Sequence, residues 1–282
     1  MIKNFFITGD THGGANTITR VSNIAQNNPK LKPEETGIII LGDCGLNFYL
    51  NKTDKKYKKM LNDIGYHIYC VRGNHEQRPE LIPTMTYTQD DNLGSMVWVE
   101  PDFPNIKYLL DGECYTFGKY RTLVIGGAYS VDKWYRLARA GIYNGVDAKY
   151  ANPKQTGWFP DEMLTEEEMT TISRQNANNK FDFVLSHTCP LSWEPTDLFL
   201  NFIDQTTVNK SMEIWMDDLK DKITWNIWLF GHFHADRIER PHVEQMYQSF
   251  TTLDDIWNRW NDKKTYSDEW WLDKSPYMEM WD

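Results

Sequence analysis

Six short apolar segments, each followed at once by small or polar residues, constrain the fold of this chain most strongly. Their length and their Ile, Val and Phe content are typical of strands that are buried on both faces. They occupy residues 2–8, 37–41, 67–71, 122–125, 181–185 and 227–230. Residues 17–26 and 55–64, which separate the first three segments, have the length and composition of crossover helices. This alternation predicts an α/β fold.

Residues with metal-binding side chains follow most of these predicted strands. Five of the seven histidines occur at such positions. In open α/β sheets, ligands bind outside the carboxyl ends of the strands, so we expect these side chains to meet in space. In chain order they are Asp10, His12, Asp43, Asn74, His75, His187, His232 and His234.

Carboxylate, amide and imidazole groups together are suitable ligands for Mn, Fe or Zn. Asp10 and His12 are two residues apart, as are His232 and His234, so each pair can face one way on an extended backbone. Asp43 could bridge two ions between these pairs. Two bridged ions can hold a hydroxide and clamp both sides of a displacement at phosphorus. Each motif alone is more often a turn or a helix cap, and only the combination predicts a dinuclear metal site.

The ordered set Gly-Asp-x-His-Gly, Gly-Asp, Gly-Asn-His-Glu, a later single His and Gly-His-x-His resembles the calcineurin-like metallophosphoesterases. The resemblance extends over residues 5–235. It implies a two-sheet sandwich flanked by helices, with a dinuclear metal site on loops at the strand ends. It also implies three sets of ligands: Asp10, His12 and His234 for the first ion; Asn74, His187 and His232 for the second; and Asp43 as the bridge.

Two further residues are assigned a catalytic role by this resemblance. His75 would protonate the leaving alkoxide or stabilise charge in the transition state. Arg72 matches an arginine that holds phosphoryl oxygens in phosphoprotein phosphatases, and its planar fork suits that task. An ion pair with Glu76 or a nearby acid is the alternative for Arg72. The second Gly-Asp continues as Cys44-Gly45 and not toward the Asp-Arg-Gly of protein phosphatases, which disfavours a protein-phosphatase assignment.

The region after the fourth predicted strand, at about residues 129–180, is rich in aromatic residues and is expected to form an insertion or lid. Aromatic faces beside cations suit a base or a sugar attached to phosphate. A solvated loop packed on the insertion is the alternative. Thr165 is predicted to cap a helix within this region. The candidates for substrate contact are Tyr129, Lys133, Trp134 and Arg136.

Composition limits the partners and the compartment. We expect a single domain over residues 1–282, with no membrane span, because no apolar run reaches the required length. The net charge of −10 disfavours long nucleic acids but permits a nucleotide held at metal ions. The absence of a signal-peptide pattern and of paired cysteine spacings indicates a cytoplasmic protein. A strand-like piece lies near residues 246–253, and the acidic, Trp-rich segment at about 254–282 is expected to pack on the domain.

These features predict a hydrolase that cleaves a phosphate monoester or diester with two metal ions. The expected partner is a small phosphorylated substrate, with nucleotides among the candidates, and the sequence identifies no protein partner. Two alternatives stay open at this stage: a protein Ser/Thr phosphatase, and a metal-binding scaffold that recruits another protein.

Overall fold

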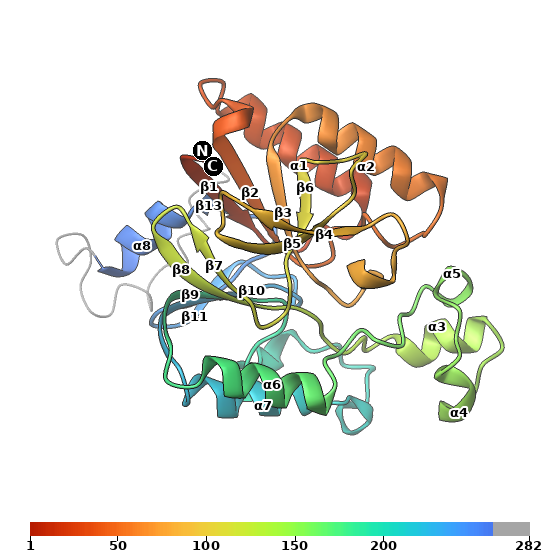
Figure 1. The fold of residues 1–282 in the computed structure, drawn as a ribbon. Helices are drawn as coiled ribbons and strands as arrows, with labels where there is room; N and C mark the ends of the chain where they lie inside the picture. Colours follow the sequence, from red (N-terminus) through yellow and green to blue (C-terminus); the bar gives the residue numbers. More distant parts are fainter. Residues whose placement is uncertain (262–282) are drawn as a thin grey trace.

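Two β-sheets stack face to face, and helices cover their outer faces (Figure 1). This arrangement comes from a computed structural model and is described for residues 1–261. The predicted α/β sandwich flanked by helices is therefore confirmed.

The first sheet has seven strands in the order β13-β1-β2-β3-β6-β5-β4. Its parallel centre consists of β1 (Asn4–Thr8), β2 (Thr36–Leu41), β3 (His67–Val71) and β6 (Ile106–Tyr108). Antiparallel strands complete both edges, namely β13 (Phe250–Thr252) on one side and β5 (Ser95–Val99) with β4 (Thr86–Asp90) on the other.

The second sheet has six strands in the order β11-β12-β10-β9-β8-β7. Its parallel strands are β12 (Val243–Gln245), β10 (Thr224–Phe230), β9 (Lys180–Ser186) and β8 (Tyr120–Ile125). The antiparallel edges are β11 (Arg237–Arg240) and β7 (Cys114–Phe117).

Strand β2 shows why the central strands are apolar throughout. Successive side chains of a strand point to opposite faces. Ile39 and Leu41 therefore enter the core between the two sheets, whereas Ile38 and Ile40 enter the core beneath the helices. Both faces of the strand are shielded from solvent, and this fixes the position of the strand in the sandwich. The residues that follow β2 are therefore placed at one edge of the sheet.

Helices α1 (Gly14–Asn27) and α2 (Lys52–Ile64) cover the first sheet, and α6 (Glu166–Asn176) and α7 (Ser211–Lys220) cover the second (Figure 1). The cap predicted at Thr165 is present as a reciprocal capping box with Glu168. Short 3₁₀ turns complete the connections: η1 (Pro33–Glu35), η2 (Pro79–Leu81), η3 (Leu191–Trp193), η4 (Thr196–Leu198) and η5 (Gln205–Thr207).

The aromatic region predicted at about 129–180 divides into two parts. Helices α3 (Lys133–Arg139), α4 (Gly145–Ala148) and α5 (Pro153–Thr156) project from the sandwich (Figure 1) around a small apolar cluster of their own. Helix α6, by contrast, packs Met169 and Ile172 into the core of the second sheet. Only the part before α6 stands apart from the two sheets.

The last described element is α8 (Leu253–Asn261). Trp257 and Trp260 pack against the core between the sheets, in keeping with the packing predicted for the tryptophans of this segment. The remaining residues of the predicted Trp-rich segment lie outside the described residues. The strand predicted near 246–253 is limited to β13. Among the described helices, none is long and apolar enough to cross a membrane.

Candidate active site

Loops at the carboxyl ends of strands from both sheets bring all seven predicted metal ligands together. Asp10 and His12 follow β1, Asp43 follows β2 and Asn74 follows β3. His187 follows β9, and His232 and His234 follow β10. The contacts described below join the two sets of loops across the sandwich.

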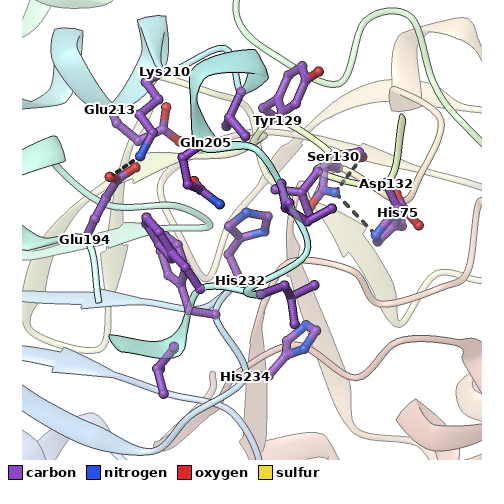
Figure 2. Close-up of a pocket in the computed structure, with 18 of the residues that line it drawn as sticks. His75, Tyr129, Ser130, Asp132, Glu194, Gln205, Lys210, Glu213, His232 and His234 are labelled. Atoms are coloured by element: carbon purple, nitrogen blue, oxygen red, sulfur yellow. Dashed lines mark hydrogen bonds and ion pairs between the residues drawn. The ribbon is translucent and has the colours of Figure 1, made fainter. Parts of the chain in front are cut away.

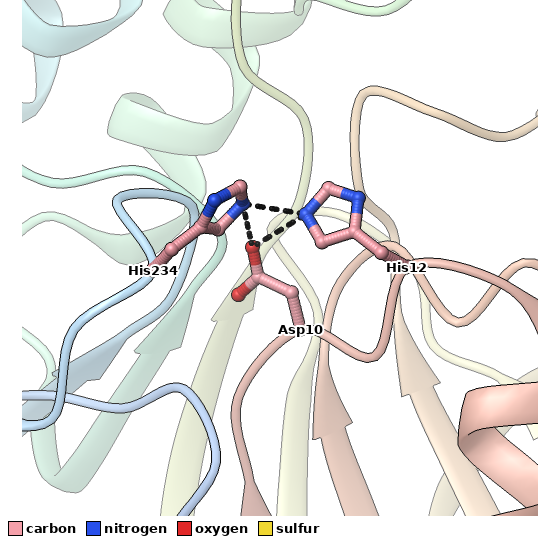
Figure 3. A group of neighbouring side chains, drawn as sticks. All are labelled: Asp10, His12 and His234. Carbon is pink, nitrogen blue, oxygen red and sulfur yellow. Dashed lines mark hydrogen bonds and ion pairs between the residues drawn. The ribbon is translucent and has the colours of Figure 1, made fainter. Parts of the chain in front are cut away.

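Asp10, His12 and His234 form the first group of ligands (Figure 3). The Oδ2 atom of Asp10 lies 3.5 Å from Nε2 of His12 and 3.4 Å from Nε2 of His234. The backbone N–H of His232 donates to both carboxylate oxygens of Asp10, at 2.9 and 3.0 Å, and so fixes the carboxylate. Three ligand atoms therefore converge on one point, as expected for the first ion.

Asp43 lies between this group and the second one. Its Oδ2 atom is 3.7 Å from Nε2 of His12 and 3.7 Å from Nε2 of His187. The other oxygen, Oδ1, accepts a hydrogen bond from the backbone N–H of His75 at 2.8 Å. Oδ2 is buried and has no hydrogen-bond partner among the described residues. An orphaned carboxylate oxygen between two groups of imidazoles fits a bridging ligand, because a cation would compensate its burial.

His187 and Asn74 provide the second group. Nδ1 of His187 donates to the carbonyl oxygen of Leu41 at 2.7 Å, so Nε2 carries the lone pair. Nε2 nevertheless lies only 2.8 Å from Oδ1 of Asn74, which is also an acceptor. Two acceptors at this distance repel each other unless a cation or a proton lies between them. The side-chain chemistry thus fits a second metal ion, with the ring of His232 centred 5.1 Å from that of His187.

The orientation of Asn74 depends on two residues that the sequence motifs do not contain. Nδ2 of Asn74 donates to Oγ of Ser130 at 2.8 Å, and that hydroxyl donates to Oε2 of Glu162 at 2.5 Å. The backbone N–H of Ser130 also donates to Glu162, at 3.1 Å. These hydrogen bonds turn Oδ1 of Asn74 toward His187. Burial raises the pKa of Glu162 to about 7.

The glycines of the motifs are required by close packing of the ligands. A Cβ atom at Gly42 would lie 2.0 Å from Nδ1 of His187, and one at Gly73 would lie 2.0 Å from Oδ1 of Asp43. Four ligands themselves have a positive φ, which is uncommon outside glycine and costs energy. They are His12 (46°), Asp43 (49°), His232 (67°) and His234 (55°).

At His232 and Asp10, burial and neighbouring charges favour the protonation states that metal ligands need. At His12, by contrast, burial is outweighed by Asp10 and Asp43, which raise the pKa. Burial lowers the pKa of His232 to about 3, which keeps its imidazole neutral. Burial alone would raise the pKa of Asp10, but hydrogen bonds with His12 and His234 hold that pKa well below its usual range.

His75 lines the cavity beside the ligands. Its Nε2 atom is 3.3 Å from Nδ2 of Asn74, and its Nδ1 atom is buried without a hydrogen-bond partner among the described residues. Burial lowers the pKa of His75. The position suits a group that acts on the substrate, and the catalytic role of His75 stays a prediction.

The buried side chain of Arg72 is occupied by contacts within the protein. The phosphate-holding role predicted for it therefore has no support in the geometry. Its side chain is 4% exposed, and Nε donates to Oδ2 of Asp111 at 2.8 Å. Nη1 and Nη2 donate to the carbonyl oxygens of Glu162 and Gly126 at 2.7 and 3.2 Å. The alternative of an ion pair is therefore favoured, although the partner is Asp111 and not Glu76.

A cavity of about 390 Å³ opens beside the metal ligands (Figure 2). Tyr129 and Arg136, two of the predicted substrate contacts, line it. Arg136 is anchored there by Oδ2 of Asp132 at 2.6 Å and by the carbonyl oxygen of Gly157 at 2.7 Å.

Lys133 and Trp134 are not among the residues that line this cavity. The ammonium of Lys133 lies 4.4 Å from the ring centroid of Trp158, in a neighbouring depression, and Trp134 is 42% exposed. The structure thus separates the four predicted substrate contacts into two that face the cavity and two that do not.

A sandwich with these ligands on its strand-end loops defines the class of metal-dependent phosphoesterases. The sequence profile of the calcineurin-like phosphoesterases matches residues 3–236, and the chain belongs to this family. Its members use divalent metal ions.

Among solved structures, phosphopantetheinyl hydrolase (PptH) from Mycobacterium tuberculosis is similar, with 15% sequence identity and a TM-score of 0.43 over 94% of this chain and 93% of that chain. A search of curated proteins finds no match.

Proposed function

We propose that this chain hydrolyses a small phosphate monoester or diester with two metal ions held by the seven ligands. One observation carries the proposal: Oδ2 of Asp43 is buried, has no hydrogen-bond partner among the described residues, and lies 3.7 Å from imidazole nitrogens of both ligand groups. A buried anionic oxygen in this position needs cations on both sides.

Each group of residues has a distinct task in this reaction. Asp10, His12 and His234 would hold one ion, Asn74, His187 and His232 the other, and Asp43 would bridge them. When bound, Mn, Fe or Zn ions would act as Lewis acids on phosphate oxygens and lower the pKa of water. His75, at the cavity wall, would deliver a proton to the leaving oxygen. The carbonyl of Leu41 and the hydroxyl of Ser130 would keep His187 and Asn74 in the orientation that binds metal.

The cavity supports a small substrate. Its volume of about 390 Å³ falls within the range of sites for small molecules, roughly 300–1,000 Å³. Tyr129 and Arg136 would contact the part of the substrate beyond the phosphate, and a nucleotide is one candidate. The four free cysteines are compatible with the cytoplasmic location expected from the sequence.

The two alternative functions receive less support. A protein Ser/Thr phosphatase would hold the phosphate with arginines, yet the second motif lacks one and Arg72 is bound to Asp111. A metal-binding scaffold would have no use for His75 at the cavity wall beside the ligands.

Hydrolysis of a chromogenic phosphate monoester and of a chromogenic diester, each with added Mn²⁺, tests the proposal. We expect turnover of at least one ester, loss of turnover with a chelator and recovery on addition of metal. Asp10→Asn serves as the inactive variant, and Asp182→Asn, at the far end of β9 from the ligands, as the matched control. A folded, metal-loaded protein without turnover of either ester would favour the scaffold.

A further inference from the structure

Glu213 is a buried carboxyl group whose chemistry the reaction at the metal ions does not use. It lies in the first turn of α7, is 5% exposed and lines the cavity. Its Oε1 atom accepts a hydrogen bond from Oγ1 of Thr188 at 2.8 Å. Its Oε2 atom has no hydrogen-bond partner among the described residues. An unpaired buried carboxyl oxygen is costly, and its retention at a cavity wall points to a ligand.

The neighbours of Glu213 compensate the charge of this carboxyl group only in part. The ammonium of Lys210 lies 2.5 Å from Oε2 of Glu194 and 4.7 Å from the ring centroid of Phe199. The charge of Lys210 is thus neutralised by Glu194. Burial is the main reason that the pKa of Glu213 rises to about 7. The charge of Glu194 adds to the rise, and the hydrogen bond from Thr188 and the charge of Lys210 reduce it. A cationic or hydrogen-bond-donating ligand would favour the ionised carboxylate.

Glu213 lies on the opposite side of the cavity from His75 and His234, with His232 between them (Figure 2). Figure 2 shows Glu213, Glu194 and Lys210 together at one end, with His75 and His234 away from them. Much of the remaining lining is apolar, although Gln205 also lines the cavity. This apolar wall consists of Leu198, Phe199, Leu200, Ile203, Val208 and Phe233.

We propose that Glu213 forms a recognition subsite for the end of the substrate remote from the phosphate. The geometry selects a phosphate ester with an apolar body and a terminal hydrogen-bond donor, with a primary amine as the best match. The metal ions would hold the phosphate, the apolar wall would cover the body, and Oε2 of Glu213 would accept the terminal N–H. The inference rests on the proposed function, because it needs the phosphate to bind at the metal ions.

Paired alkyl phosphates provide the test in the unaltered, metal-loaded protein. Each pair has the same chain, of butyl to octyl length, and ends either in a methyl or in an amino group. We expect the amino-terminated ester of the best-fitting length to have the higher kcat/KM, by about ten- to 100-fold, as for a buried hydrogen bond to a charged group. A methyl-terminated series that is hydrolysed equally well or better at every length would overturn the proposal.

A variant then assigns the preference to one residue. In Glu213→Gln, the ratio of kcat/KM for the amino- and methyl-terminated esters should fall toward one, because an amide cannot balance the ammonium charge. Asp218→Asn, an exposed change on the same helix, is the matched control and should retain the ratio. An unchanged ratio in Glu213→Gln would reject Glu213 as the recognition group.

The wild-type comparison does not depend on whether the variant folds. Absence of turnover of all alkyl phosphates and of the chromogenic esters would contradict the proposed function. Turnover of the chromogenic esters with no amino preference would contradict the subsite alone.

Discussion

At the scale of single residues, Arg72 and Asp111 form an ion pair beside the metal centre, with side chains 4% and 13% exposed. Arg72→Met would leave the carboxylate of Asp111 without its cation in a largely dry environment. We expect the free energy of unfolding to fall by about 3–5 kcal/mol, as for other broken buried pairs. Denaturant unfolding of wild type and variant measures the change in the free energy of unfolding. Unchanged stability together with a raised KM would restore the phosphate-holding role for Arg72.

Ser130 is expected to act through Asn74. Ser130→Ala removes the acceptor for Nδ2 of Asn74 and leaves that amide free to rotate away from His187. Loss of such a supporting contact typically weakens metal affinity by about 10- to 100-fold. Metal titration of the variant measures the change.

Ser173→Ala is the matched control for Ser130, since Ser173 accepts a hydrogen bond from Trp215 in α6–α7 packing. That variant should alter stability without altering metal affinity. Equal metal affinity in Ser130→Ala and wild type would show that Asn74 is held by other contacts.

The catalytic role of His75 can be tested by how the rate loss on its substitution depends on the leaving group. His75→Asn should retain metal but slow the hydrolysis of alkyl phosphates, by about 10²–10⁴-fold if the imidazole protonates the leaving oxygen. The leaving groups of esters of acidic phenols need little protonation, so the loss of hydrolysis rate for these esters should be much smaller. Steady-state kcat values for the two kinds of ester decide this. An equal loss for both would indicate that His75 positions the substrate or the carboxylate of Asp43 instead.

At the scale of elements, the projecting helices α3–α5 reach the cavity through Arg136. Arg136→Ala removes a cation from the cavity wall and should raise KM for the larger substrates by about tenfold, more than for a small generic ester. Arg139→Ala is the control, since Arg139 contacts Tyr135 on the same helix and does not line this cavity. If both variants change all KM values equally, the segment contributes packing and no substrate contact.

The sequence predicted the longer strands that are buried on both faces and missed exposed or very short strands. β3 has the predicted bounds, and β1, β2, β8, β9 and β10 differ from the prediction only at their ends. β4 carries Thr86-Tyr87-Thr88-Gln89-Asp90 on a mostly exposed edge, and β6 and β12 have only three residues each. Neither kind of strand produces a long apolar run, since β4 is polar and β6 and β12 are too short, although β12 is buried throughout.

At the scale of the whole molecule, the positions of the metal ligands were predictable, because parallel strands end at one edge of a sheet and the motifs occur in the same order as in the family. The residues that support the metal ligands could not be predicted. Ser130 lies 56 residues from Asn74, and Glu162 lies 32 residues from Ser130. Glu213 sits in an ordinary amphipathic helix, and only the folded chain places it on the cavity. The ion-pair partner of Arg72 could not be predicted for the same reason, since Asp111 is 39 residues away.

Titration of the metal-free protein with Mn²⁺, followed by electron paramagnetic resonance, tests the central claim that Asp43 bridges two ions in one site. We expect two ions to bind per chain and their spectrum to show exchange coupling, because bridged ions would share ligand atoms. Asp43→Asn should weaken binding and abolish the coupling, since a neutral amide cannot balance two cations. Binding of a single ion, or of two ions with the spectrum of isolated Mn²⁺, would contradict the account.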